Sequence, residues 1–124
     1  MTRKRVLSVG QCAADHSAIS HLVEKHFDAE VGGVDSIPEA IGKLRDDEFS
    51  LVLVNRILDG GVSPGLEFIR QIKSDESLQQ IPVMLVSNYD DAQDEARQIG
   101  AEPGFGKASL GQPQMLARVK AFLA

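Results

Sequence analysis

The sequence predicts an α/β protein in which helices cover both faces of a parallel five-stranded sheet. Short aliphatic runs bounded by turn residues alternate five times with longer segments whose apolar residues recur at helical spacing. The short runs are apolar throughout, which is typical of strands buried on both faces. Because crossovers between parallel strands are right-handed, such a chain folds into a doubly wound (βα)5 three-layer sandwich.

Length and composition indicate the number of domains and the class of protein. The chain has 124 residues, so we expect one domain over residues 1–124. Apolar residues make up 43% and charged residues 25%, which is typical of a folded protein and not of a disordered one. The single cysteine, Cys12, excludes an internal disulfide and a cysteine-rich zinc module.

Charge and hydropathy exclude two classes of partner. No apolar run approaches the roughly 18 residues of a membrane span, and the apolar stretch behind the basic start ends at Val9, too early for a signal peptide. We therefore expect a cytoplasmic location and no membrane contact. A net charge of −5 and an aromatic content of 5% disfavour direct binding to nucleic acid.

The first part of the chain predicts two strand–helix units. Residues 5–10 form the first apolar run, and residues 13–27 carry apolar side chains at helical spacing. A weak run at residues 29–31 comes before the second helix. Ser36 is the expected N-cap of that helix, and Glu39, three residues on, completes a capping box.

The middle of the chain holds the two clearest strands. Residues 50–55 contain four consecutive aliphatic residues, and residues 82–87 begin with a proline, which the first position of a strand tolerates. Between them, the composition of residues 59–65 predicts a surface loop, and residues 66–72 predict the third helix.

The last part of the chain completes the pattern. Residues 90–99 predict a polar helix that Gly100 ends. Residues 103–107 predict a short strand weakened by glycine, and residues 115–123 carry the apolar stripe of the final helix.

Sites in parallel α/β sheets form where the strands end, at their carboxyl edge. The residues at the predicted strand ends are Gly10, Gln11, Asn55, Ser87 and Lys107. We expect these five residues to surround any functional site.

At these residues the chain resembles the receiver domain of two-component response regulators, over essentially its whole length. The resemblance depends on the order and spacing of several short motifs, which are Leu51–Asn55, Gly65–Glu67, Pro82–Ser87, Gly100–Ala101 and Lys107. It implies a flavodoxin-like fold with strand order 2-1-3-4-5 and a role in phosphorelay signal transduction.

The resemblance also implies which residues should carry phosphotransfer. In the family, two acids after the first strand hold Mg²⁺, an Asp after the third accepts the phosphoryl group, and a Ser or Thr and a Lys contact its oxygens. Here Gly10 and Gln11 occupy the acid-pair positions and Asn55 the acceptor position, whereas Ser87 and Lys107 are retained. Mg²⁺ prefers carboxylate oxygens, and an uncharged amide is a poor nucleophile.

The sequence therefore predicts a pseudo-receiver without catalytic residues, metal or cofactor. We expect it to bind a protein partner, either a signalling protein or a fused output domain. In the family, the fourth helix, fifth strand and fifth helix usually form the contact surface, which corresponds here to parts of residues 90–99, 103–106 and 110–123. The aromatic residue often found three positions before the Lys is replaced by Gly104.

Other interpretations of the site residues stay open. A small anion or metabolite over Asn55, Ser87 and Lys107 would make the domain a sensor. A Ser–Lys hydrolase pair is chemically conceivable, but no oxyanion hole or substrate cleft is recognisable. Against these functional roles, we expect Asn55 to satisfy neighbouring backbone groups. We expect Lys107 to be solvated or to pair with Asp15 or Asp59.

Two further patterns suggest metal sites weakly. Cys12 is followed by three histidines spaced five residues apart, so their side chains rotate around the helix and do not converge. The acids in residues 90–95 suit the start of a helix. We expect solvated side chains in both patterns.

Overall fold

A five-stranded parallel sheet organises the protein. The computed structural model describes residues 3–58 and 63–124. The sheet order is β2-β1-β3-β6-β7, which confirms the predicted order 2-1-3-4-5 with β6 and β7 as fourth and fifth strands. The strands are β1 (Lys4–Val9), β2 (Ala29–Val34), β3 (Leu51–Asn55), β6 (Val83–Val86) and β7 (Glu102–Phe105). The helices are α1 (Ala13–His26), α2 (Ile37–Asp46), α3 (Gly65–Ser74), α4 (Asp90–Gln98) and α5 (Pro113–Leu123).

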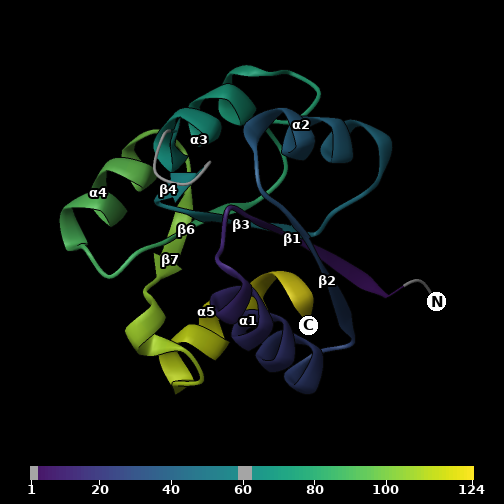
Figure 1. Ribbon diagram of the computed structural model, residues 1–124, viewed down its shortest axis with the longest axis vertical. Helices are drawn as coiled ribbons and strands as arrows, with labels where there is room; N and C mark the ends of the chain where they lie inside the picture. The colour runs from purple at the N-terminus through teal and green to yellow at the C-terminus, as the bar shows by residue number, and fades with distance from the viewer. Residues whose placement is uncertain (1–2, 59–62) are drawn as a thin grey trace.

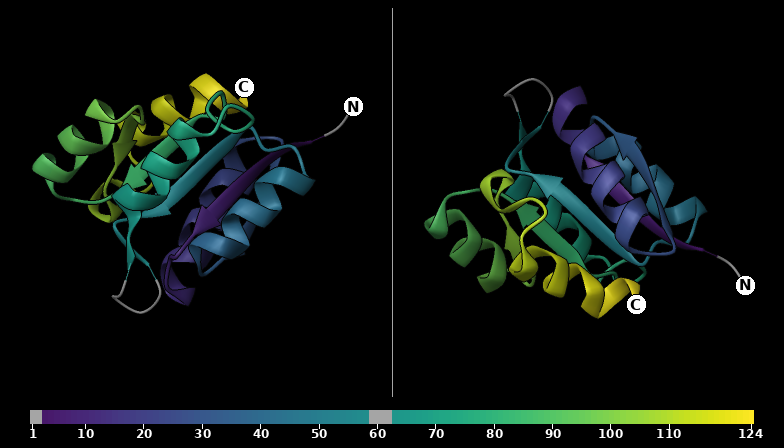
Figure 2. Two further views of the ribbon diagram at one scale, coloured as in Figure 1. Left: turned by 90° about the horizontal axis from the view of Figure 1, so that it is seen from above. Right: turned by 90° about the horizontal axis from the view of Figure 1, so that it is seen from below.

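The helices lie in two layers, so the predicted three-layer sandwich is confirmed. Helices α1 and α5 cover one face of the sheet, and α2, α3 and α4 cover the other (Figures 1 and 2). Leu51 and Leu53 of β3 belong to the core under α1 and α5, whereas Val52 and Val54 belong to the core on the opposite face. This alternation explains why the strand is apolar at every position.

Local signals in the sequence set several element ends. The Ser36 hydroxyl accepts a hydrogen bond from the Glu39 backbone N–H at 3.3 Å, which confirms the expected cap of α2. Gly100, with a φ of 110°, follows the end of α4 as predicted. No helix in the described residues is long and apolar enough to cross a membrane.

Three element boundaries differ from the predictions. Strand β2 continues to Val34 because its whole length pairs with β1. The predicted loop at residues 59–65 is shorter, since β5 (Ser63–Pro64) pairs antiparallel with β4 (Ile57–Leu58) and α3 begins at Gly65. Residues 59–62 lie outside the described residues. Lys107 is not in the last strand but begins a short 3-10 turn, Lys107–Ser109.

The last two strands of the sheet are joined partly by a side chain of α4. The β6–β7 register shifts between its two paired positions. At this irregularity the Gln93 amide donates to the carbonyls of Leu85 at 2.9 Å and Ser87 at 3.1 Å, and accepts from the Gly104 N–H at 3.3 Å. The carbonyl of Gly104 in turn accepts a hydrogen bond from Arg118 of α5. Helices α4 and α5 are thereby tied to β7 from both sides.

Only glycine fits at position 104. A Cβ atom there would lie 2.2 Å from the Leu85 carbonyl oxygen and 2.9 Å from the Gln93 side-chain oxygen. The backbone carbonyl cannot move away without breaking the sheet. The backbone of Leu85, and next to it the Gln93 side chain, therefore leave no room for an aromatic side chain at this position.

We predict that Gly104→Ala lowers the free energy of unfolding by about 1–3 kcal/mol, because the added methyl group overpacks the sheet. The matched control is Gly42→Ala, since Gly42 lies inside α2 with no atom within 4 Å of the Cβ position. The control should stabilise the protein by roughly 0.5–1 kcal/mol through helix propensity. Urea unfolding measures both, and equal effects of the two variants would contradict the close packing.

Candidate functional site

The carboxyl ends of β3 and β6 and the turn after β7 surround a shallow pocket of about 350 Å³. Three residues predicted for the site, Asn55, Ser87 and Lys107, line it together. Its remaining lining residues are Arg56, Ile57, Val86, Asn88 and Tyr89. We call this the strand-end pocket. Gly10 and Gln11 do not line it.

The amide of Asn55 is already engaged with the backbone. Its nitrogen donates to the carbonyl oxygens of Gly10 at 3.2 Å and Ile57 at 2.9 Å. Both carbonyls belong to neighbouring backbone groups of the kind expected as partners of Asn55. The side chain thus ties the end of β1 to the turn after β3.

The ammonium group of Lys107 is paired with Asp15 from the first turn of α1. The distance from Lys107 Nζ to Asp15 Oδ2 is 2.6 Å. The hydrogen bond from Lys107, and then one from the thiol of Cys12 at 3.2 Å, hold the pKa of Asp15 below its usual value. Of the two acids considered as partners for Lys107, the structure selects Asp15, whereas Asp59 lies outside the described residues.

Ser87 is buried and used structurally. Its hydroxyl accepts a hydrogen bond from the backbone N–H of Tyr89 at 3.1 Å, at the start of the connection to α4. No hydrogen bond joins Ser87 to Lys107 among the described residues, since Lys107 is bound to Asp15. This geometry gives no support to a Ser–Lys nucleophilic pair.

Two residues of the pocket escaped the sequence analysis. The guanidinium carbon of Arg56 lies 5.0 Å from the centre of the Tyr89 ring, within the range of a cation–π contact. Tyr89 is 58% exposed, and Arg56 is also exposed, so both side chains stand at the pocket rim. The signal in the sequence was their position, since Arg56 directly follows the end of β3 and Tyr89 lies three residues after the end of β6.

The residues at the acid-pair positions do not fit a divalent cation. Gly10 has no side chain, and Gln11 lines a different cavity together with Ser8 and His16. The nearby carboxylate of Asp15 is bound to Lys107. In the described ranges, no group of three or more His, Cys, Asp or Glu side chains is placed to hold a metal ion. The available donors are neutral amides and one paired carboxylate, so the site lacks the free carboxylate oxygens that Mg²⁺ prefers.

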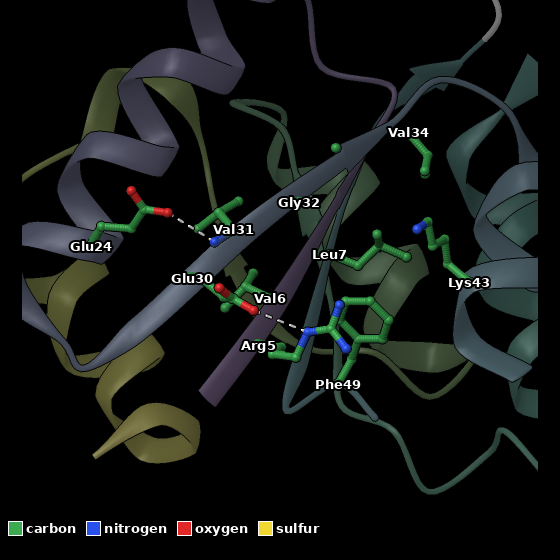
Figure 3. A pocket seen from close by; sticks show the side chains of 11 residues that line it. Arg5, Val6, Leu7, Glu24, Glu30, Val31, Gly32, Val34, Lys43 and Phe49 are labelled. Atoms are coloured by element: carbon green, nitrogen blue, oxygen red, sulfur yellow. Dashed lines mark hydrogen bonds and ion pairs between the residues drawn. The ribbon is translucent and has the colours of Figure 1, made fainter. Parts of the chain in front are cut away.

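A second cavity of about 350 Å³ lies along β2 and shares no lining residue with the strand-end pocket (Figure 3). The guanidinium of Arg5 stacks on the Phe49 ring at 4.9 Å and pairs with Glu30 at 3.3 Å. The backbone N–H of Val31 donates to Glu24 of α1 at 3.0 Å. The charges of Arg5 and Glu30 thus compensate each other, and the carboxylate of Glu24 is used by the backbone of β2.

Comparison with known proteins identifies the fold. No protein-family model matches the chain, and no curated protein matches it. Many solved structures do. A putative response regulator from Chloroflexus aurantiacus has a TM-score of 0.86 at 15% identity over 98% of both chains. A response regulator receiver protein from Pseudomonas putida has 0.81 at 19% over 98% of both. The chemotaxis response regulator CheY4 of Vibrio cholerae has 0.75 at 19% over 98% of this chain and 100% of its own.

The chain therefore has the fold of CheY-like response regulator receiver domains, which confirms the resemblance at the level of structure. At these identities the likeness concerns the fold. The chemistry of the strand-end pocket depends on its own residues.

The Asp15–Lys107 pair predicts a pH-dependent stability. A carboxylate whose pKa is depressed in the folded protein stabilises the fold at pH values above its ordinary pKa, about 3.9, and this contribution disappears as the pH falls through the folded value. We expect Asp15→Asn to lower the free energy of unfolding at neutral pH by at most about 1 kcal/mol, because the pair is partly exposed. The difference from the wild type should vanish in strong acid.

Urea unfolding at several pH values measures this dependence. Glu76→Gln is the control, since Glu76 is exposed and forms no ion pair among the residues with known placement. An Asp15→Asn deficit that persists unchanged at low pH would show that the carboxylate charge is not responsible.

Proposed function

We propose that this domain is a pseudo-receiver of two-component signal transduction, a non-enzymatic module that binds a protein partner without being phosphorylated. The observation that carries the proposal is the neutral amide of Asn55 at the end of β3, bound to two backbone carbonyls. An amide in this position offers no carboxylate to accept a phosphoryl group.

The charge balance around the pocket supports the same proposal. The response regulator Rcp1, which shares the fold at 19% identity, has been solved in a Mn²⁺-bound form. In this chain Asp15 neutralises Lys107, and the acid-pair positions are Gly10 and Gln11. A divalent cation therefore finds no free carboxylate there, and the charge of Lys107 is already compensated by Asp15.

The surface formed by α4, β7 and α5 is the proposed contact site. Gln93 and Arg118 tie both helices to Gly104 at the centre of this surface. Exposed acids cover its α4 part, which are Asp90, Asp91, Asp94 and Glu95. We propose that the partner offers a complementary basic surface.

A fused output domain is one form that the partner can take. The chain matches 28% of the longer NtrX chain from Brucella abortus, at a TM-score of 0.82 and 18% identity. By this analogy we propose a cytoplasmic module that acts either on a separate signalling protein or within a longer chain.

A second candidate function is a sensor for a small anion or metabolite in the strand-end pocket. The exposed guanidinium of Arg56 beside Ser87 and Lys107 favours it. Such a ligand has to compete with Asp15 for Lys107, which makes it the weaker candidate. Thermal-shift measurements with small anions test it, and the absence of any stabilisation in the wild type would exclude it.

We predict that incubation with Mg²⁺ and a small phosphodonor leaves the intact mass of the protein unchanged, because no carboxylate stands at position 55. A receiver domain with an Asp acceptor, treated in parallel, should gain one phosphoryl group and lose it in acid. A stoichiometric, acid-labile adduct on the wild-type chain would falsify the pseudo-receiver proposal.

We predict that the double variant Asp94→Lys/Glu95→Lys weakens capture of the partner from native lysate at least ~10-fold, because it reverses the charge of α4. The matched control, Asp46→Lys/Glu76→Lys, changes the charge equally at exposed positions outside α4, β7 and α5 and should capture normally. Quantitative mass spectrometry compares the captured proteins. Equal losses in both variants would place the contact elsewhere.

A further inference from the structure

Tyr89 is the one exposed large apolar side chain in the part of the chain that the structure describes. It is 58% exposed and lies directly before α4, next to the strand-end pocket. The guanidinium of Arg56 lies 5.0 Å from the ring centre, so it covers part of the ring and leaves the rest open to solvent. Exposed tyrosine rings are frequent anchors of protein–protein contacts, because they bury a large area at little cost in side-chain entropy.

Two carboxylates flank this ring. Asp90 and Asp91 are the first residues of α4 and are exposed, and neither takes part in an ion pair within residues 3–58 and 63–124. Their two negative charges outweigh the single positive charge of Arg56. We call Tyr89, Asp90 and Asp91 together the aromatic knob. A complementary surface has to offer an apolar recess with positive charge at its rim.

An open groove with these properties lies between the ends of α1 and α5. Its volume is about 510 Å³, and its large apolar lining residues are Phe27, Leu116 and Leu123. His26 and Lys120 also line it, and neither forms an ion pair among the residues with a described position. We call this recess the α1–α5 groove.

The charge around the α1–α5 groove is positive. Its one acidic side chain, Asp28, is bound to Arg3 at 3.3 Å. Lys120 and the exposed Lys25 each carry a full charge in the last turn of a helix, whereas each helix end contributes only about half a negative charge. His26 adds a further positive charge when it is protonated.

The aromatic knob and the α1–α5 groove lie at opposite edges of the sheet. Tyr89 lines the strand-end pocket together with Asn55, at the carboxyl edge. The groove is lined by the last turns of α1 and α5, and Figure 2 shows the end of α5 on the side where β1 begins, away from the end of β3. The two surfaces therefore cannot meet within one molecule, but they meet when two molecules stack end to end.

We propose that the protein associates head to tail with a second copy of itself, with the aromatic knob of one molecule seated in the α1–α5 groove of the next. The Tyr89 ring packs on the apolar lining, and the carboxylates of Asp90 and Asp91 face Lys120. The contact joins two different surfaces, so it leaves one knob and one groove free in every pair. No phosphoryl group or other protein takes part, so the inference is independent of the pseudo-receiver proposal.

The small size of the contact makes the association weak. One tyrosine side chain buries roughly 150–250 Å². Stable interfaces bury about 1,200 Å² or more in total. We therefore expect a dissociation constant on the order of 1 mM, as for a transient contact.

Two substitutions separate the knob from the groove. Tyr89→Ser removes the ring and leaves the groove intact, whereas Ala117→Glu places a carboxylate in the groove and leaves the knob intact. Both positions are exposed, so both variants should fold, which the dispersion of their NMR signals verifies. Neither variant should associate with itself.

The deciding experiment mixes the two variants. Nitrogen-labelled Tyr89→Ser is titrated with unlabelled Ala117→Glu and followed in two-dimensional proton–nitrogen NMR spectra. We expect saturable shifts of the Phe27 and Leu116 backbone signals, with a dissociation constant on the order of 1 mM. Unlabelled Tyr89→Ser, which lacks the knob, should leave these signals unchanged. No saturable shift with Ala117→Glu, or equal shifts with both additions, overturns the proposal.

Further variants test the groove and the charges of the knob. In the labelled molecule, adding Ala117→Glu to Tyr89→Ser should abolish the shifts. Adding Ala14→Glu, at an exposed position of α1 outside the groove, should leave them unchanged. In the unlabelled molecule, Asp90→Asn/Asp91→Asn should weaken binding about 2–10-fold, as for exposed ion pairs. Equal effects of the two added glutamates, or unchanged binding without the knob carboxylates, overturn the proposed contact.

Discussion

The burial of the three central strands, β1, β3 and β6, on both faces of the sheet is the constraint on which the rest of the structure depends. Because the strands are apolar on both sides, helices have to cover both faces, and each crossover returns the chain to the same end of the sheet. Asn55, Ser87 and Lys107, which are far apart in the sequence, meet at that end for this reason. The scaffold thus assembles a pocket whether or not its residues support chemistry.

Electrostatics determine what this pocket can do. The fold itself matches receiver domains closely, but Asn55 is neutral and Asp15 compensates the charge of Lys107. The hydroxyl of Ser87, a residue that the resemblance retains, accepts a hydrogen bond from the backbone N–H of Tyr89 before α4. A pocket of this kind is more consistent with a structural role for its side chains than with phosphotransfer, which is why we propose the surface of α4, β7 and α5 as the contact site.

Much of the fold was predictable because its signals are local. Aliphatic runs, the Ser36 cap and Gly100 each act within a few residues, and the structure confirms them. The contact of Gln93 with the β6–β7 register shift was missed, since it depends on how a helix side chain fits between two strands. The sequence placed Asn55, Ser87 and Lys107 in one site, but it could not show that the side chain of Gln11 belongs to a different cavity.

The hydrogen bond from the Val31 N–H to Glu24 has a consequence for self-association. Strand β2 is the outermost strand of the sheet, and an outermost strand with open backbone donors invites another molecule to add a strand. Here a carboxylate from α1 occupies one of those donors and places a negative charge beside it. This arrangement disfavours the addition of a strand from a second molecule at an edge that the exposed Gly32 and Gly33 leave without covering side chains.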